Sequence, residues 1–235
     1  MDVIVSVKRD REDRTSTTTL HEFKRGDRAQ RSRWAFFNSL LAILFFLGTS
    51  SFAASNPFDD ASAAYEHGDY VQAMKLFRQL AEQGHQWAQR RVGLMYAEGK
   101  GVRQDYQEAV KWYRLAAAQR NTPAQYSLGL AYEKGQGVPQ DFQEAVNLYR
   151  LAAAKGNQFA QINLGVVYAH GRGVRQDFVR AHMWFNLAAA ALSGDSGNTA
   201  TKNRDRIASK MTAQQIATAQ EMARRCQESK LKNCD

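Results

Sequence analysis

The amino-acid sequence predicts an all-α protein, specifically a right-handed α-solenoid of stacked antiparallel helix pairs. Its composition favours helices, because Ala, Gln, Leu and Arg are abundant and only three prolines occur in 235 residues. No long alternation of Val, Ile and Thr indicates strands. The stretch GKGVRQDYQEAVKWYRLAAA begins at Gly99 and returns in altered form at Gly135 and Gly171, a period of 36 residues. Repeats of this length are typical of solenoids built from helix pairs.

The composition also limits the class of function. With 44% hydrophobic and 23% charged residues, the chain is typical of a globular protein. The formal charge of +9 lies largely at the two ends: residues 1–33 carry nine Lys and Arg against six Asp and Glu, and residues 202–235 carry eight against four. No basic stripe interleaved with aromatic residues occurs between them, so we expect no nucleic-acid partner.

The first helix of each unit is predicted from a Leu-Gly or Val-Gly pair that precedes a Tyr. The three units open at Ala88, Ala124 and Ala160. In the second unit, Leu128 and Tyr132 are four residues apart and therefore share one helical face. A glycine inside a helix costs up to about 1 kcal/mol relative to alanine, so the recurrence of Gly129 and its counterparts indicates close approach of a partner helix.

A turn of the form G-x-G-V ends each first helix and leads to a second. The two glycines supply left-handed or loosely restrained backbone, and the valine packs the loop onto the core. An Asp begins each second helix, and a Glu three residues later gives two of the three starts the form of a capping box. Arg180 replaces this Glu in the third unit, where a weaker cap is expected. The second helix is predicted to bury an aromatic residue and pairs of alanines; the aromatic positions are Tyr113, Tyr149 and Phe185.

Together these letters, A-x-x-x-L-G-x-x-Y…G-x-G-V-x-x-D…A…W-Y…A-A, resemble the Sel1-like repeat, a relative of the tetratricopeptide repeat. The resemblance covers residues 88–200 as three repeats, at 88–123, 124–159 and 160–199. Three departures are local. Arg120 replaces the usual closing glycine, Leu148 replaces a tryptophan, and four extra residues around SGDSG are expected to alter the stacking in the last unit.

The segments on either side are predicted to cap this stack. Residues 56–87 lack the G-x-G-V loop and suggest a shorter, tetratricopeptide-type helix pair, in which Asp69 caps the second helix. Residues 200–235 suggest capping helices and a cysteine-containing tail, with a helix around residues 206–209 and a capping box from Thr212 to Gln215. Terminal repeats need a polar outer face, and the charged residues of this tail supply one.

Residues 1–55 are interpreted as a charged leader followed by an export signal or membrane anchor. A basic stretch precedes a mostly apolar core at residues 35–47, which is shorter than the roughly 20 residues that span a bilayer. Residues 51–53 offer a cleavage site of the A-x-A type. A cleaved signal is the leading interpretation; an uncleaved anchor extended through residues 34–54 and a buried core helix are the alternatives. The first predicts a periplasmic or secreted protein, and the second a protein anchored to the inner membrane.

The two cysteines, Cys226 and Cys234, lie close together near the C-terminus. In an oxidising compartment they can close a small loop worth roughly 2–3 kcal/mol. Two unrelated free thiols are the alternative. A metal site is not expected, because no His or carboxylate pair lies beside them at ligand spacing.

The candidate site is the concave surface formed by the first helices, where related repeats bind partner segments. Mapping this sequence onto the tetratricopeptide pattern selects four groove positions in each repeat. One lies one residue before the opening Ala, and the others lie two, six and ten residues after it. These positions differ between units, unlike the scaffold letters, and would make a largely apolar groove with a few charges. The alternative is that several, above all the aromatic ones, pack between repeats. They are Trp87, Arg90, Leu94, Glu98, Pro123, Tyr126, Leu130, Lys134, Phe159, Ile162, Val166 and His170.

No catalytic or cofactor constellation is recognised. The histidines show no paired spacing, and the G-x-G-V turn lies between helices, where a dinucleotide loop would follow a strand. The sequence therefore predicts a non-enzymatic adaptor without cofactors that binds another envelope protein. The resemblance implies roles such as restraining a membrane sensor kinase or assembling an export complex. An envelope hydrolase or a peptidoglycan- or β-lactam-binding protein is the alternative, although members associated with β-lactams carry a cysteine pair in each repeat and this chain has none there.

Overall fold

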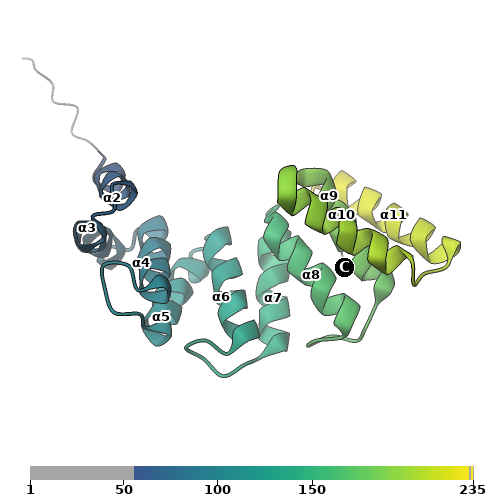
Figure 1. Ribbon diagram of the computed structural model, residues 1–235, viewed down its shortest axis with the longest axis horizontal. Helices are drawn as coiled ribbons and strands as arrows, with labels where there is room; N and C mark the ends of the chain where they lie inside the picture. Colours follow the sequence, from purple (N-terminus) through teal and green to yellow (C-terminus); the bar gives the residue numbers. More distant parts are fainter. Residues whose placement is uncertain (1–55, 233, 235) are drawn as a thin grey trace, which may run out of the picture. The chain divides into compact units, whose positions relative to one another are not determined.

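The computed structural model describes residues 56–232 and 234, and within that part of the chain every regular element is a helix (Figure 1). The predicted leader, residues 1–55, lies outside the described residues. The described residues belong to one compact unit. Its helices are α2 (Pro57–Glu66), α3 (Tyr70–Glu82), α4 (Gln86–Glu98), α5 (Tyr106–Ala118), α6 (Thr122–Lys134), α7 (Phe142–Ala153), α8 (Gln158–His170), α9 (Phe178–Ala191), α10 (Gly194–Ala208) and α11 (Ala213–Glu228).

Consecutive helices pair and the pairs stack, as predicted for a solenoid. The most extensive contacts join α4 to α5, α6 to α7 and α8 to α9, which are the two helices of each repeat. Each second helix then contacts the first helix of the following pair. At the C-terminal end α10 and α11 both pack on α9. The all-α solenoid class predicted from the repeat is therefore confirmed.

The glycine inside each first helix faces the aromatic ring of the second helix, as the sequence predicted. A Cβ atom on Gly129 would lie 2.7 Å from the ring of Tyr149, a distance that real Cβ atoms essentially never show. The same relation joins Gly93 to Tyr113 and Gly165 to Phe185. The glycine thus lets the ring lie directly against the helix backbone.

The two glycines of each G-x-G-V turn have different tasks. The first ends the helix in the left-handed conformation, as Gly135 does with φ +67°. The second, Gly137, lies against the preceding repeat: a Cβ there would be 2.1 Å from the carbonyl oxygen of Tyr106, the first residue of α5. Gly101 touches the start of α3 in the same way. Sequence reasoning assigned both glycines only to backbone freedom, whereas the second also joins one repeat to the next.

Aspartate caps all three second helices of the repeats. Asp105, Asp141 and Asp177 each accept a hydrogen bond from the backbone N–H three residues later. The weaker cap expected at the third helix is not observed, because Arg180 donates a backbone bond and also pairs with Asp177 through its guanidinium at 2.7 Å. The full reciprocal capping box forms between Thr212 and Gln215, as predicted.

The C-terminal segment closes the stack differently from the prediction in one respect. The SGDSG stretch, expected to be an insertion, starts α10, which runs from Gly194 through the helix predicted near residues 206–209.

The predicted disulfide joins Cys226 to Cys234 across a Cα–Cα distance of 4.7 Å. Both cysteines are buried in the cluster that contains the core of the last repeats, so the tail is part of that core.

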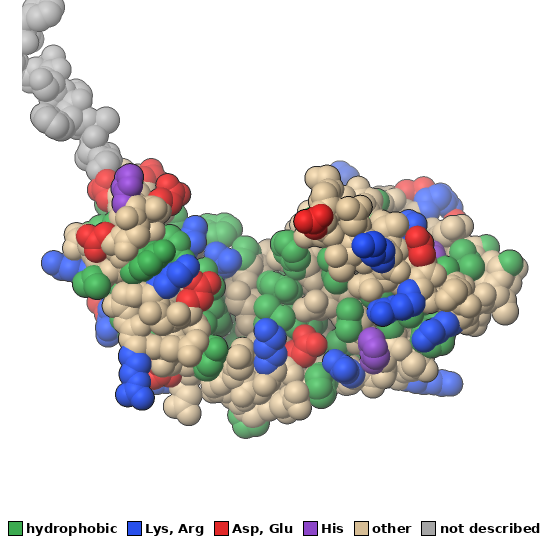
Figure 2. Space-filling view, viewed as in Figure 1, with side chains coloured by type: hydrophobic (Ala, Val, Ile, Leu, Met, Phe, Trp, Pro, Cys, Tyr) green, Lys and Arg blue, Asp and Glu red, His purple; other side chains and the backbone are tan. Residues whose placement is uncertain are grey.

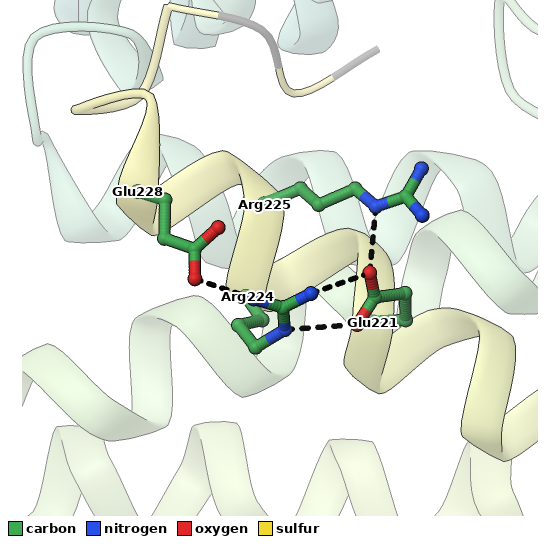
Figure 3. A network of polar contacts seen from close by, with 4 residues as sticks. All are labelled: Glu221, Arg224, Arg225 and Glu228. Atoms are coloured by element: carbon green, nitrogen blue, oxygen red, sulfur yellow. Dashed lines mark hydrogen bonds and ion pairs between the residues drawn. The ribbon is translucent and has the colours of Figure 1, made fainter.

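The outer side of α11 carries the polar face predicted for a terminal cap. Glu221 accepts hydrogen bonds from Arg224 at 2.7 Å and from Arg225 at 2.6 Å, and Arg224 also donates to Glu228 (Figure 3). The bonds from Arg224, followed by those from Arg225, lower the pKa of Glu221 to about 2. Because these side chains are exposed, their ion pairs add little to the stability of the fold.

Candidate protein-binding groove

The first helices of the three repeats present equivalent faces because their ends are fixed in the same way. His85, Asn121 and Asn157 each accept a hydrogen bond from the backbone N–H of the opening alanine. Each helix then ends at a glycine in the left-handed conformation. Positions two, six and ten after the opening alanine are four residues apart, so they form one row along each helix.

The structure leaves all twelve predicted groove residues at least partly exposed. Trp87 exposes 46% of its surface and Phe159 49%, so neither ring is buried in the core. Leu94, Leu130 and Val166, at equivalent positions, are half-buried. Figure 2 shows the described unit hollowed on one side, with hydrophobic side chains on the walls of the hollow.

The rows of neighbouring helices join into one surface. The Tyr126 ring lies 6.2 Å from that of Phe159 in the next repeat and 5.9 Å from that of Tyr149 beneath it. Leu94 and Leu130 line one pocket of about 160 Å³ between adjacent repeats, with Lys134 at its edge. An extended or helical segment laid across the repeats would therefore meet a continuous apolar strip.

The charged side chains of the groove differ in how many hydrogen bonds and ion pairs they make. Glu98 is paired with Lys100 at 2.9 Å and accepts a bond from Tyr65. Arg90 is partly buried, and its Nε makes no hydrogen bond within the described structure. Burial, followed by the nearby charge of Arg91, lowers the pKa of Arg90. A guanidinium remains charged even so, and a carboxylate from a bound segment would complete its hydrogen bonding.

A partly buried hydrogen bond supports the centre of the groove. Tyr149 donates from its hydroxyl to Glu133 at 2.5 Å. Burial, together with this bond, raises the pKa of Tyr149, so the phenol remains protonated. Burial also raises the pKa of Tyr126. These tyrosines therefore present neutral rings and hydroxyls, which suits the binding of a peptide segment.

Sequence reasoning missed a link between repeats that the structure reveals. Arg114 donates to the hydroxyl of Tyr132 at 2.9 Å, and Arg150 donates to Tyr168 at 2.6 Å. Each arginine comes from a second helix and each tyrosine from the following first helix. The recurrence of Arg at the same place in the repeat was a visible signal, but its partner is 18 residues away on another helix.

The described part of the chain lacks two further features. Among residues 56–232 and 234, no three His, Cys, Asp or Glu side chains gather where they could hold a metal ion. None of the helices in this part combines the length and the apolar character needed to cross a bilayer.

A stack of helix pairs with a continuous, partly apolar concave row defines a helical-repeat scaffold of the kind that generally mediates protein interactions. The Sel1 repeat family model matches residues 61–85, 88–121, 122–157 and 158–191, together more than half of the chain. The chain belongs to the Sel1 repeat family. The model counts residues 61–85 as a further repeat, a segment that the sequence analysis assigned to a tetratricopeptide-type cap.

Solved structures agree with this assignment. A Sel1 repeat protein from Oxalobacter formigenes is 31% identical with a TM-score of 0.59, over 64% of this chain and 58% of that protein. A second structure is that of c5321, a protective antigen present in uropathogenic Escherichia coli strains. It is 28% identical with a TM-score of 0.51, and the match covers 70% of this chain and 42% of the c5321 chain. The chain thus spans less than two thirds of either relative. A search of curated proteins gave no match.

Proposed function

We propose that this chain is a non-enzymatic adaptor of the cell envelope that binds a partner protein through the groove of α4, α6 and α8. The observation that carries the proposal is the row of half-exposed aromatic and aliphatic side chains at positions that vary between otherwise constant repeats. Aromatic residues and arginine are the residues on which binding energy usually concentrates. A membrane sensor kinase or a component of an export complex is the kind of partner we expect.

The envelope location rests on two features of the chain. An apolar core with a basic lead, at residues 35–47, has the form of an export signal or an anchor. The Cys226–Cys234 disulfide suits an oxidising compartment. Cell fractionation tests the location: we expect the protein outside the cytoplasm, and a soluble cytoplasmic pool would contradict it.

The groove is tested by truncating its two most exposed rings in the full-length chain. The double variant Trp87→Ala/Phe159→Ala should lose its partner in affinity capture from membranes followed by mass spectrometry. Because both rings are about half exposed, the melting temperature should change little.

A matched control exists on the second helices. Leu115 and Leu151 expose 50% and 54% of their surfaces, so Leu115→Ala/Leu151→Ala removes comparable apolar surface outside the groove. The control should retain the partner. Loss of the partner in both variants, or in neither, would contradict binding through the groove. Turnover of a β-lactam or of a cell-wall fragment by the purified chain would instead favour the hydrolase alternative.

A further inference from the structure

A pocket of about 160 Å³ lies in the groove between the first and second repeats. Leu94 of α4 and Leu130 of α6 stand at equivalent places on its wall, and the buried ring of Tyr113 from α5 also lines it. An engineered apolar cavity of about 150 Å³ in another protein holds a benzene molecule. The pocket is therefore large enough for one apolar side chain of a bound segment.

Small residues of the first helices make room for this pocket. Three of them line it: Ala97, Ser127 and Ala131. At the positions 36 residues further along, the chain has Glu133, Asn163 and Val167. There Glu133 reaches the hydroxyl of Tyr149, the counterpart of the Tyr113 ring on the pocket wall. The sequence thus leaves room at the first junction that larger side chains take up at the second.

Two cations flank the pocket on opposite sides. Arg90 lies one turn before Leu94 on α4, and Lys134 lies one turn after Leu130 on α6, where it lines the pocket. Because α4 and α6 are both first helices and run in the same direction, the two cations stand beyond opposite ends of the pair of leucines. Arg90 is also close enough to Tyr113 to interact with it electrostatically.

Neither cation has a carboxylate partner in the described part of the chain. The Nε atom of Arg90 is shielded from solvent without a hydrogen bond, and Lys134 is exposed without an ion pair. The helices α4 and α6 carry one carboxylate each, and both are engaged: Glu98 by a lysine and Glu133 by a tyrosine hydroxyl. Asp and Glu are absent from the described residues that line the pocket. A bound segment can supply the missing acids.

We propose that the groove takes an acidic segment of the partner protein, in which one leucine-sized side chain fills this pocket and carboxylates on either side of it bind Arg90 and Lys134. The inference rests on the proposed function of the groove and names the chemistry of its partner. Hydrogen bonds between charged groups are stronger than neutral ones, and a filled pocket is where binding energy concentrates. Residues 34–55 of the chain itself carry no charge, so they lack the carboxylates that these cations would bind.

The test measures fluorescence anisotropy of a fluorescein-labelled nonapeptide with the full-length chain. The peptide has leucine at its centre, three glutamates on each side and glycine at both ends. It should bind saturably, and its affinity should fall as salt is raised, because exposed charges are screened.

Two matched peptides separate the pocket from the charges. One has glycine in place of the leucine, and the other has glutamine in place of every glutamate. Each should bind at least about tenfold more weakly, because each lacks one of the two kinds of contact. Equal binding of the glycine peptide would overturn the role of the pocket. Equal binding of the glutamine peptide would overturn the role of the cations and favour an uncharged occupant such as residues 34–55.

Substitutions in the chain test the same contacts. Lys134→Glu reverses an exposed charge and should weaken binding of the leucine–glutamate peptide at least about tenfold. Lys75→Glu is the matched control on the second helix α3, outside the groove, and should change the affinity little. Ala97→Gln fills the pocket with a neutral side chain as long as that of Glu133 and should also weaken binding. If melting shows that Ala97→Gln unfolds, the glycine peptide makes the same test without a substitution.

Unchanged affinity in folded Lys134→Glu would overturn the proposal. Affinity capture from membranes then separates this inference from the proposed function. If Trp87→Ala/Phe159→Ala loses the partner while Lys134→Glu and Ala97→Gln keep it, the groove binds a partner of other chemistry and only this inference fails. If Trp87→Ala/Phe159→Ala keeps the partner, the groove function itself fails. A wild-type dimer that Lys134→Glu dissociates would assign the groove to a second copy of the chain and contradict the proposal.

Discussion

The second and third repeats share their sequence pattern, yet one is open on its outer side and the other is covered. Leu151 of α7 exposes 54% of its surface, whereas Leu187, at the same place in α9, exposes 3%. The difference arises because α10 and α11 pack on α9, while no such layer covers α7 in the described part of the chain. The period of the sequence therefore determines how a helix pair packs internally, and the neighbouring segments determine what becomes buried outside it.

The two repeats also differ at a buried position of the same helices. Val146 in the second repeat is replaced by His182 in the third, and both are buried. The Nδ1 atom of His182 makes no hydrogen bond within the described structure. The third repeat therefore combines the common seam with a buried titratable group.

The largest effect should come from the seam that both repeats share. Tyr149→Ala and Phe185→Ala each remove a fully buried ring that lies against a helix glycine. Each should lower the free energy of unfolding by about 3–5 kcal/mol, measured by denaturant titration.

Tyr149→Phe is the matched control for this pair. It gives the second repeat the ring of the third and loses only the hydrogen bond to Glu133, so it should cost about 1 kcal/mol. If Tyr149→Phe were as damaging as Tyr149→Ala, the hydroxyl rather than the ring would hold the repeat together.

The next effect should appear only in the third repeat and only in acid. Burial lowers the pKa of His182 from its ordinary value of 6.5; Arg204 of α10 lowers it further, and Asp205 opposes this. The unfolded chain therefore binds a proton at His182 more readily than the folded chain does. Stability should fall as the pH drops below about 6.5 and through the lower pKa of the folded state.

His182→Val, the residue of the second repeat, isolates this effect. Denaturant midpoints at pH 7.5 and 5.5 should differ for the wild-type chain and differ much less for the variant. An equal loss in both chains would assign the acid sensitivity to other groups.

Features that depend on nearby residues were predictable from the sequence. The glycine that ends each first helix, the aspartate caps and the Thr212–Gln215 box are all set by contacts within one turn. The groove row was equally accessible, because helical spacing alone places Tyr126 and Leu130 on one face. The recurrence of glycine at the position of Gly129 also predicted that the second helix packs closely there. In the structure the ring of Tyr149 lies against this glycine.

Apart from the approach at Gly129, contacts between side chains of different helices were not predictable. Arg180 was interpreted only as a broken capping box, since its neighbour Tyr168 lies on another helix. Likewise α10 begins within a glycine- and serine-rich stretch, where local preference favours a turn, and its packing on α9 overrides that preference.

The smallest effect concerns the turns that lead into the second and third repeats. Arg120 adopts φ +62° at the turn before α6, where the turn before α8 has Gly156 at φ +81°. A side chain in this conformation costs about 1–2 kcal/mol, partly offset by the greater freedom of glycine in the unfolded chain. Arg120→Gly should therefore raise the free energy of unfolding by about 0.5–1 kcal/mol.

Gly156→Ala provides the opposite change at the equivalent turn. Among the described residues, a Cβ atom on Gly156 would meet Leu231 alone, at 3.8 Å, which is an ordinary contact, so the expected cost comes from the backbone. The variant should lose about as much stability as Arg120→Gly gains, measured by the same denaturant titration. Arg120→Gly could instead destabilise the chain. The arginine side chain would then contribute a contact that outweighs its backbone strain, and the turn before α6 would differ from the turn before α8 in its contacts as well as in its backbone conformation.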